Sequence, residues 1–318
     1  MTPYQIAQIV LPVFGLLGLG YVCRWTGYLS QEAGEALGKF VYGVAIPLML
    51  FRKLGTAHFP DASPWGLYVS YFTAIAVVWI SADIIGRKVF GRGQRGGIIA
   101  GISASYSNLV MVGIPLVLTA YGDEGMVPLL LLIAIQLPVM VTVTTILIAK
   151  VDHDQNGGGR LEPVAIGRRI VVTLARNPII IGMLAGSAWR IAGLGLHEIP
   201  AAAMDKLGNA AVACALFSLG MALRQYGIRG NLGPGIAIGA LKLAIMPALV
   251  WLLAANVFVL PPVWVSVAVL AAAQPTGVNA YLIANHFNTG HGLAANSITL
   301  TTSAAILTIG LWFGFLGL

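Results

Sequence analysis

The sequence predicts an all-α integral membrane protein of ten transmembrane helices, built as two inverted five-helix repeats in which helices 4 and 9 are broken. Three observations predict this fold. The chain of 318 residues is 58% apolar and 9% charged, a composition that excludes an ordinary soluble domain. Its apolar runs are about 17 to 25 residues long, the length at which an α-helix crosses a bilayer. Two of these runs, one in each half of the chain, carry Pro and Gly beside carboxamides in their middle.

Ten apolar spans can be placed along the chain. They cover residues 5–22, 35–51, 64–86, 97–119, 125–149, 170–190, 207–223, 234–256, 263–285 and 291–315. Of the 18 Lys and Arg residues, thirteen fall on one side of this arrangement, four fall on the other and Lys242 lies inside a span. Because positively charged loops stay in the cytoplasm, this bias predicts a multi-pass protein of the inner (plasma) membrane with both termini on the non-cytoplasmic side. The same scatter argues against nucleic-acid binding, despite a net charge of +7.

A polar stretch divides the chain into two halves. It predicts a first repeat at residues 1–149, a cytoplasmic linker at 150–169 and a second repeat at 170–318. An offset of 166 residues aligns the halves, and it pairs Pro12 with Pro178, Gly20 with Gly186, Arg24 with Arg190, Phe51 with Phe217 and Asn108 with Gln274. Since each half has an odd number of spans, the second half enters the membrane in the opposite sense, which is typical of secondary transporters. Chance matching of abundant Gly and Pro is the alternative.

The first break lies in the stretch Ser105 to Pro115, which reads Ser-Tyr-Ser-Asn-Leu-Val-Met-Val-Gly-Ile-Pro. Pro115 has no N–H and Gly113 adds backbone freedom, so we expect the helix to open between about Met111 and Pro115. In hydrocarbon, free backbone groups are tolerated only where they are buried in protein or line a cavity. The break therefore predicts part of a binding site.

The second break lies between Ala271 and Tyr281, where Pro275 and Gly277 interrupt the ninth span. Each break creates half-helix ends whose N-termini carry partial positive charge, which suits an anion. The carboxamides of Asn108, Gln274 and Asn279 add hydrogen-bonding groups. Gln136 on the fifth span and Thr302 on the tenth, which the offset of 166 residues aligns, add two more. The predicted substrate-binding residues are Asn108, Gly113, Ile114, Pro115, Gln136, Gln274, Pro275, Gly277, Asn279 and Thr302. The alternative is that these polar groups only satisfy the broken backbone or join helices.

Two ionisable residues inside spans are predicted to support transport or to couple it to an ion. Asp83 lies near the cytoplasmic end of the third span, where Arg87 at i+4 can pair with it, and Lys242 lies deeper in the eighth span. Asp83 and Lys242 could form a buried pair that breaks during transport, Lys242 could stand in the place of a coupling cation, or its side chain could extend to the cytoplasmic surface. No cofactor and no metal site are expected.

The motifs around the breaks resemble those of the auxin efflux carrier family. Asn108-Leu-Val-Met-Val-Gly-Ile-Pro-Leu, followed by Tyr121-Gly122, is similar to the family's fourth-helix signature, and Gln274-Pro-Thr-Gly-Val-Asn-Ala-Tyr to its ninth-helix crossover. The resemblance implies a fold like that of bile acid:sodium symporters. It also implies a scaffold of spans 1, 2, 6 and 7, often dimeric, and a moving domain of spans 3–5 and 8–10. Plant PIN members carry proline where this chain has Asn279, and the short linker resembles that of bacterial members, which carry malonate or malate.

The sequence therefore predicts a secondary active transporter, and not an enzyme, that moves a small organic anion by elevator-type alternating access. A dicarboxylate such as malonate or malate is the first choice. An auxin-like monocarboxylate or an amino acid remains open, and an ion channel is a further alternative that the inverted repeat disfavours. The expected partners are the substrate, the lipid bilayer and a second copy of the chain in a homodimer formed through the scaffold helices. Proton coupling, sodium coupling and uniport all remain open.

Overall fold

A computed structural model describes residues 2–56, 63–155, 163–226 and 232–317. The described residues are helical apart from their turns and one isolated two-residue β-bridge. The chain divides into two compact units. Unit 1 comprises Met1–Pro12, Ser63–Ile166 and Tyr226–Leu318, and unit 2 comprises Val13–Ala62 and Gly167–Gln225.

Unit 2 is built from segments of the first two spans of each predicted repeat. Its helices are α1 (Pro3–Trp25, of which the first residues belong to unit 1), α2 (Gln31–Phe40), η1 (Val41–Ala45), α3 (Ile46–Thr56), α7 (Pro163–Ala175, beginning in unit 1), α8 (Pro178–Ile191) and α9 (Glu198–Tyr226, ending in unit 1). Between α7 and α8 the chain bends by 73°. Asn177 caps α8 there, because its Oδ1 accepts a hydrogen bond of 3.0 Å from the Ile179 N–H and Pro178 follows at the first helical position.

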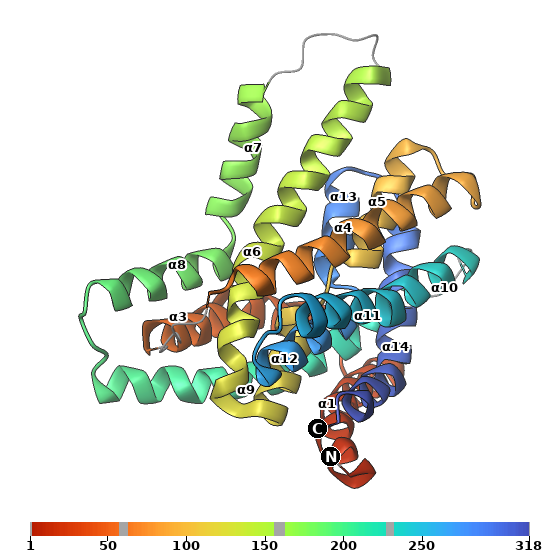
Figure 1. Ribbon diagram of the computed structural model, residues 1–318. Coiled ribbons are helices and arrows are strands. Elements are labelled where there is room, and N and C mark those ends of the chain that lie inside the picture. The colour runs from red at the N-terminus through yellow and green to blue at the C-terminus, as the bar shows by residue number, and fades with distance from the viewer. Residues whose placement is uncertain (1, 57–62, 156–162, 227–231, 318) are drawn as a thin grey trace. The chain divides into compact units, whose positions relative to one another are not determined.

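The closest helix packing in unit 2 joins α3 to α8 (Figure 1). Gly182 and Gly186 lie one helical turn apart on α8, and a Cβ at either position would come within 2.5 Å of Pro47 O or 2.6 Å of Phe51 O on α3. Small residues at this spacing let two membrane helices approach backbone to backbone. The pair of glycines therefore fixes the distance between α3 and α8.

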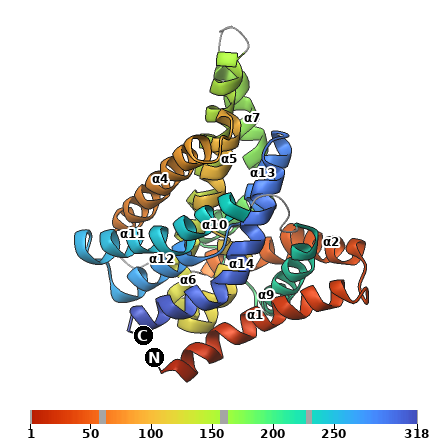
Figure 2. The same cartoon turned by 90° about the vertical axis from the view of Figure 1, so that its right-hand side faces the viewer.

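Unit 1 holds both broken spans. Its further helices are α4 (Trp65–Lys88), α5 (Gln94–Ser105), η2 (Leu109–Gly113), α6 (Ile114–Gln155), α10 (Leu232–Ala240), η3 (Leu241–Ile245), α11 (Met246–Trp251), η4 (Leu252–Val257), α12 (Pro262–Ala273), α13 (Val278–His286) and α14 (His291–Phe315). Within this unit α4 packs against α5 and α11, α12 against α6 and α11, and α10 against α14 (Figure 2).

Among the described residues, seven helical segments are long and apolar enough to cross a membrane, or eight if the bent pair α7–α8 counts as one span. The protein is thus a multi-pass membrane protein, but helix length alone does not reach the ten predicted spans. One reason is that α5, α12 and α13 have only 12, 12 and 9 residues. Another is that α6 continues through the expected turn between the fourth and fifth spans, where only Gly122 leaves helical geometry, with φ 58° and ψ −145°.

The predicted linker is partly helical. α6 runs to Gln155 and α7 begins at Pro163, so the segment predicted as a cytoplasmic linker at 150–169 is helical at both of its ends. Residues 156–162 lie outside the described part of the chain. Asp152, within the helical part, forms an ion pair with Arg95 at the start of α5, and its Oδ1 accepts a hydrogen bond of 2.6 Å from Arg95 Nε.

Candidate functional site

The two interrupted helices of unit 1 meet at their breaks. α5 ends at Ser105 and α12 ends at Ala273, and the extended residues that follow them pair through an antiparallel bridge between Ser107 and Thr276. The Asn108 N–H donates to Pro275 O, and the Gly277 N–H donates to Tyr106 O, both at 2.9 Å. Each break thus satisfies backbone groups that the other has freed, as burial away from water requires.

The first break lies earlier than the sequence predicted. The chain leaves the helix at Tyr106–Asn108 and resumes at Leu109, so the expected opening between Met111 and Pro115 is wrong. The reason is that Asn108 starts the new helix: its Oδ1 accepts from the Met111 N–H at 3.2 Å. The turn that follows is a π-helix, in which the Gly113 N–H donates to Asn108 O at 3.0 Å, five residues back. Pro115 follows as the second residue of α6.

The second break lies where the sequence placed it. The residues between α12 and α13 are Gln274 to Gly277, and Pro275 and Gly277 are both buried. Thr276 ties this segment to its neighbours, because its hydroxyl donates to Ser103 O at 2.7 Å and its N–H donates to Thr301 Oγ1 at 2.9 Å. A Cβ on Gly277 would lie 2.5 Å from Cδ1 of the Tyr106 ring, so only glycine allows this close approach.

Gln136, on α6, is hydrogen-bonded to the first break. Its Nε2 donates to Ser107 O at 2.9 Å, and its Oε1 lies 2.7 Å from the hydroxyl of Tyr71 on α4. The same Tyr71 hydroxyl lies 2.9 Å from Ser107 Oγ. Gln136 and Tyr71 are both buried, so their polar groups are used inside the protein. The arrangement favours a supporting role for Gln136 over direct contact with a substrate.

Lys242 contacts the first break at the same residue, Ser107. It lies in the π-helical turn η3 and is 0% exposed, so its side chain does not extend to the surface. Its Nζ lies 2.8 Å from Ser107 Oγ and 2.5 Å from Ala272 O. Asp83 pairs with Arg87 instead, so the buried Asp83–Lys242 pair that the sequence allowed is absent from this structure.

Four side chains around the paired breaks keep a buried polar atom without a hydrogen-bond partner. These atoms are Asn108 Nδ2, Gln274 Oε1, Thr302 Oγ1 and Ser103 Oγ. Such groups are costly in a protein interior, and a bound ligand or an ordered water is one way to satisfy them. Gly113 lies beside this group, since a Cβ there would lie 3.7 Å from Gln274 Cγ.

The remaining predicted residues lie at the edges of this arrangement. Ile114 is fully buried at the start of α6 beside Pro115. Asn279, on α13, is half-buried, and its Nδ2 donates to the Tyr106 hydroxyl at 2.7 Å. The sequence did not predict Tyr71 and Ser103 at this place, or the role of Ser107. A tyrosine inside an apolar span was the one available signal for Tyr71.

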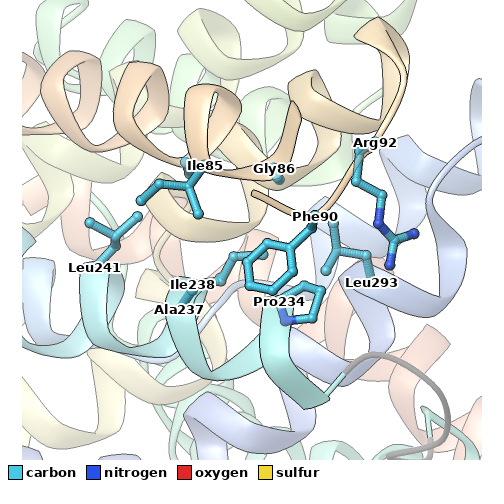
Figure 3. Close-up of a pocket in the computed structure, with 11 residues that line it drawn as sticks. Ile85, Gly86, Phe90, Arg92, Pro234, Ala237, Ile238, Leu241 and Leu293 are labelled. Carbon is cyan, nitrogen blue, oxygen red and sulfur yellow. The ribbon is translucent and has the colours of Figure 1, made fainter. Parts of the chain in front are cut away.

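A small cavity lies elsewhere in unit 1, between α4, the turn after it and α10. It is lined mostly by apolar side chains, among them Phe90 and Pro234, with Arg92 at one end (Figure 3). Its volume of about 10 Å³ has room for one water, so it does not hold a substrate in this conformation. Within the described ranges, no group of three His, Cys, Asp or Glu side chains could hold a metal ion.

Comparison with known proteins places the chain in a family. The model of the family described as "Membrane transport protein" matches residues 5–313. The "Putative malonate transporter" of Rhizobium meliloti is 26% identical over 312 residues, which cover 96% of this chain and 94% of that protein. "Auxin efflux carrier component 8" of Arabidopsis thaliana is 26% identical over 332 residues, covering 90% of each chain, and an "Uncharacterized transporter" of Methanothermobacter thermautotrophicus is 26% identical over 315 residues, covering 96% of each. The chain therefore belongs to the membrane transport protein family, which is the auxin efflux carrier family, and it is a transporter.

Proposed function

We propose that this protein is a secondary active transporter of a small organic dicarboxylate, with malonate as the first candidate, and that the substrate binds beside the paired breaks. The observation that carries the proposal is the buried Nδ2 of Asn108, which has no hydrogen-bond partner. Asn108 as a residue is 5% exposed and follows Ser107, which forms the bridge. An amide N–H at a half-helix start is a donor suited to a carboxylate oxygen. The printed name of the Rhizobium meliloti relative supports malonate.

The proposed substrate-binding residues are those predicted from the sequence, now divided by their contacts. Asn108, Gln274 and Thr302 have unpartnered buried polar atoms and are proposed to contact the substrate. Gly113, Ile114, Pro115, Pro275 and Gly277 are proposed to shape the site, and Gln136 to support it. Asn279 is proposed at its edge, where its side chain is half-buried.

The proposed mechanism is elevator-type alternating access. Its support is that both breaks and every residue named above belong to unit 1, while unit 2 consists of segments from spans 1, 2, 6 and 7. In this proposal unit 1 moves, unit 2 forms the scaffold and the homodimer contact, and ten spans form two inverted repeats with both termini outside the cytoplasm of a plasma membrane. The paired breaks in the fourth and ninth positions support the repeat. A proton or sodium ion is proposed as the coupling ion.

A second candidate substrate is an auxin-like monocarboxylate, which the printed name of the Arabidopsis thaliana relative favours. Both candidates present a carboxylate to the same donors. They differ in the rest of the molecule, because malonate has a second carboxylate and an auxin has an aromatic ring.

The test is uptake of labelled malonate into proteoliposomes, with and without inward proton or sodium gradients. Saturable uptake that unlabelled malate competes away is expected, and a gradient that accelerates it identifies the coupling ion. Asn108→Ala should abolish uptake, whereas Asn256→Ala, which removes an exposed amide of the same unit, should leave it unchanged. Normal uptake by folded Asn108→Ala protein refutes the site. Transport of indole-3-acetate without malonate transport selects the second candidate, and flux that neither saturates nor shows counterflow indicates a channel.

A further inference from the structure

Lys242 presents a buried amine to three acceptors. Its Nζ lies 2.8 Å from Ser107 Oγ, 2.5 Å from Ala272 O and 3.3 Å from Met246 Sδ. The carbonyl of Ala272 belongs to the last turn of α12, where carbonyls lack helical partners and carry partial negative charge. The amine is thus held at the break of α12 on one side and at the break after α5 on the other.

The protons along this chain of contacts can be counted. Ser107 O is a carbonyl and accepts only, so Gln136 must turn its Nε2 toward it and its Oε1 toward Tyr71. The single hydroxyl proton of Tyr71 is then donated to Gln136 Oε1. The proton in the 2.9 Å contact between the Tyr71 and Ser107 hydroxyls must therefore come from Ser107. Ser107 Oγ has then donated its own proton to Tyr71, so the proton in its contact with Lys242 Nζ must come from the amine.

The count favours the charged form of the amine. Ser107 Oγ and Ala272 O each accept from Nζ, and the weaker acceptor Met246 Sδ lies 3.3 Å away, so an ammonium can supply all three contacts whereas a neutral amine has only two protons. Its positive charge has no carboxylate within ion-pair distance among the described residues. In the same unit, Asp83 pairs with Arg87 and Asp152 with Arg95.

A buried ammonium without a counter-charge is costly, and a negative group nearby lowers that cost. The acceptor Ser107 precedes Asn108, whose buried Nδ2 is a donor without an acceptor. The ammonium lacks a counter-charge and the Asn108 amide lacks an acceptor, and one anionic oxygen near the break would supply both.

We infer that the Lys242 ammonium is the fixed counter-charge of the transported anion, so that the site selects carboxylates over neutral molecules of the same shape. The inference rests on the proposed function and assigns its charge selectivity to one residue. Lys242 acts through the electrostatic field of its charge at the paired breaks and through its contact with Ser107. It is therefore a positioning and selectivity residue that need not touch the substrate. Removing its charge should weaken binding of an anion far more than binding of the matching amide.

The experiment measures binding of malonate and of its neutral diamide, malonamide, to the purified full-length protein at equal ionic strength, by calorimetry and thermal unfolding. Wild type should prefer malonate. In Lys242→Met that preference should fall about 10- to 100-fold, and Lys242→Arg should retain part of it. Lys88→Met makes the same charge change at the exposed end of α4 and should leave the preference unaltered. An unaltered preference in folded Lys242→Met protein overturns the inference.

The failure of malonate as substrate is a separate outcome. If wild type binds acetate, malate or indole-3-acetate but not malonate, malonate falls as substrate, and the same comparison is made with that acid and its amide. If wild type binds none of these acids better than its amide, no anion balances Lys242 and the inference is overturned. This last measurement needs no variant, so it decides the question even if Lys242→Met does not fold.

Discussion

Ser107 and Thr276 form an antiparallel β-bridge between two helix breaks, although the described part of the chain is otherwise helical. The bridge explains how two interrupted spans can exist in a membrane protein. The backbone groups of Tyr106 and Asn108 that have left the first helix are bonded by Gly277 and Pro275 of the second break.

Gly277→Ala should disrupt the bridge. The new methyl group would lie 2.5 Å from Cδ1 of the Tyr106 ring and 3.1 Å from Ser107 O, so ring or backbone must shift. We expect a loss of about 1–3 kcal/mol in stability and a larger relative loss of transport, measured by thermal unfolding and by uptake. Gly38→Ala is the control, because a Cβ at Gly38 meets nothing within 4 Å. A Gly277→Ala protein as stable and active as Gly38→Ala would contradict the described contact.

Tyr71→Phe should destabilise the protein without changing its shape. The change removes the hydroxyl that lies 2.7 Å from Gln136 Oε1, and a buried acceptor left unpaired costs about 1–3 kcal/mol. Chemical or thermal unfolding in detergent measures the loss. Tyr28→Phe deletes the same hydroxyl at a residue that is 82% exposed and should have no measurable effect. Equal midpoints for the two variants would show that Tyr71 does not support Gln136.

Gly182→Ala and Gly186→Ala should each separate α3 from α8. Added Cβ atoms would come within 2.5 Å of Pro47 O and 2.6 Å of Phe51 O, and a helix backbone cannot move aside as a flexible side chain does. The expected cost is about 1–3 kcal/mol for each variant, and more for the pair. Gly167→Ala on α7, where a Cβ meets nothing within 4 Å, is the matched control. Retention of full stability by the double variant would rule out the close packing.

Arg95→Met should have little effect on stability. The ion pair of Arg95 with Asp152 has side chains that are 39% and 36% exposed, and pairs so accessible to solvent contribute at most about 1 kcal/mol. The unfolding midpoint should move by a few degrees or less, and the difference from wild type should shrink at high salt. A large loss that persists in high salt would show that the pair does more than join α5 to α6.

The helical fold and the second helix break could be predicted, because composition and the helix-breaking effects of Pro and Gly act locally. Pro275 and Gly277 break the ninth span where they stand in the sequence, since proline cannot donate and glycine permits close approach. The first break was misplaced because a capping side chain outweighed a proline. Asn108 begins a new helix whose π-turn accommodates Pro115, and such a turn has no signature in the sequence.

The partners of the polar residues could not be predicted, because they depend on tertiary packing. Sequence spacing suggested that Asp83 and Lys242 could pair, yet Arg87 at i+4 holds Asp83 and the two breaks hold Lys242. The role of Tyr71 depends in the same way on α4 packing beside α5. The ten-span count stays a prediction, since interrupted helices are too short to be recognised by length.

The bridge also constrains how the protein is made. Its two residues, Ser107 and Thr276, are separated by more than half of the chain. During synthesis the carbonyl of Tyr106 and the N–H of Asn108 therefore enter the membrane long before Pro275 and Gly277 are available to bond them. Contacts between distant segments form late in folding. The first broken helix must wait in an unsatisfied or temporarily different form, and a chain truncated before Gln274 would lack the partner that its first half requires.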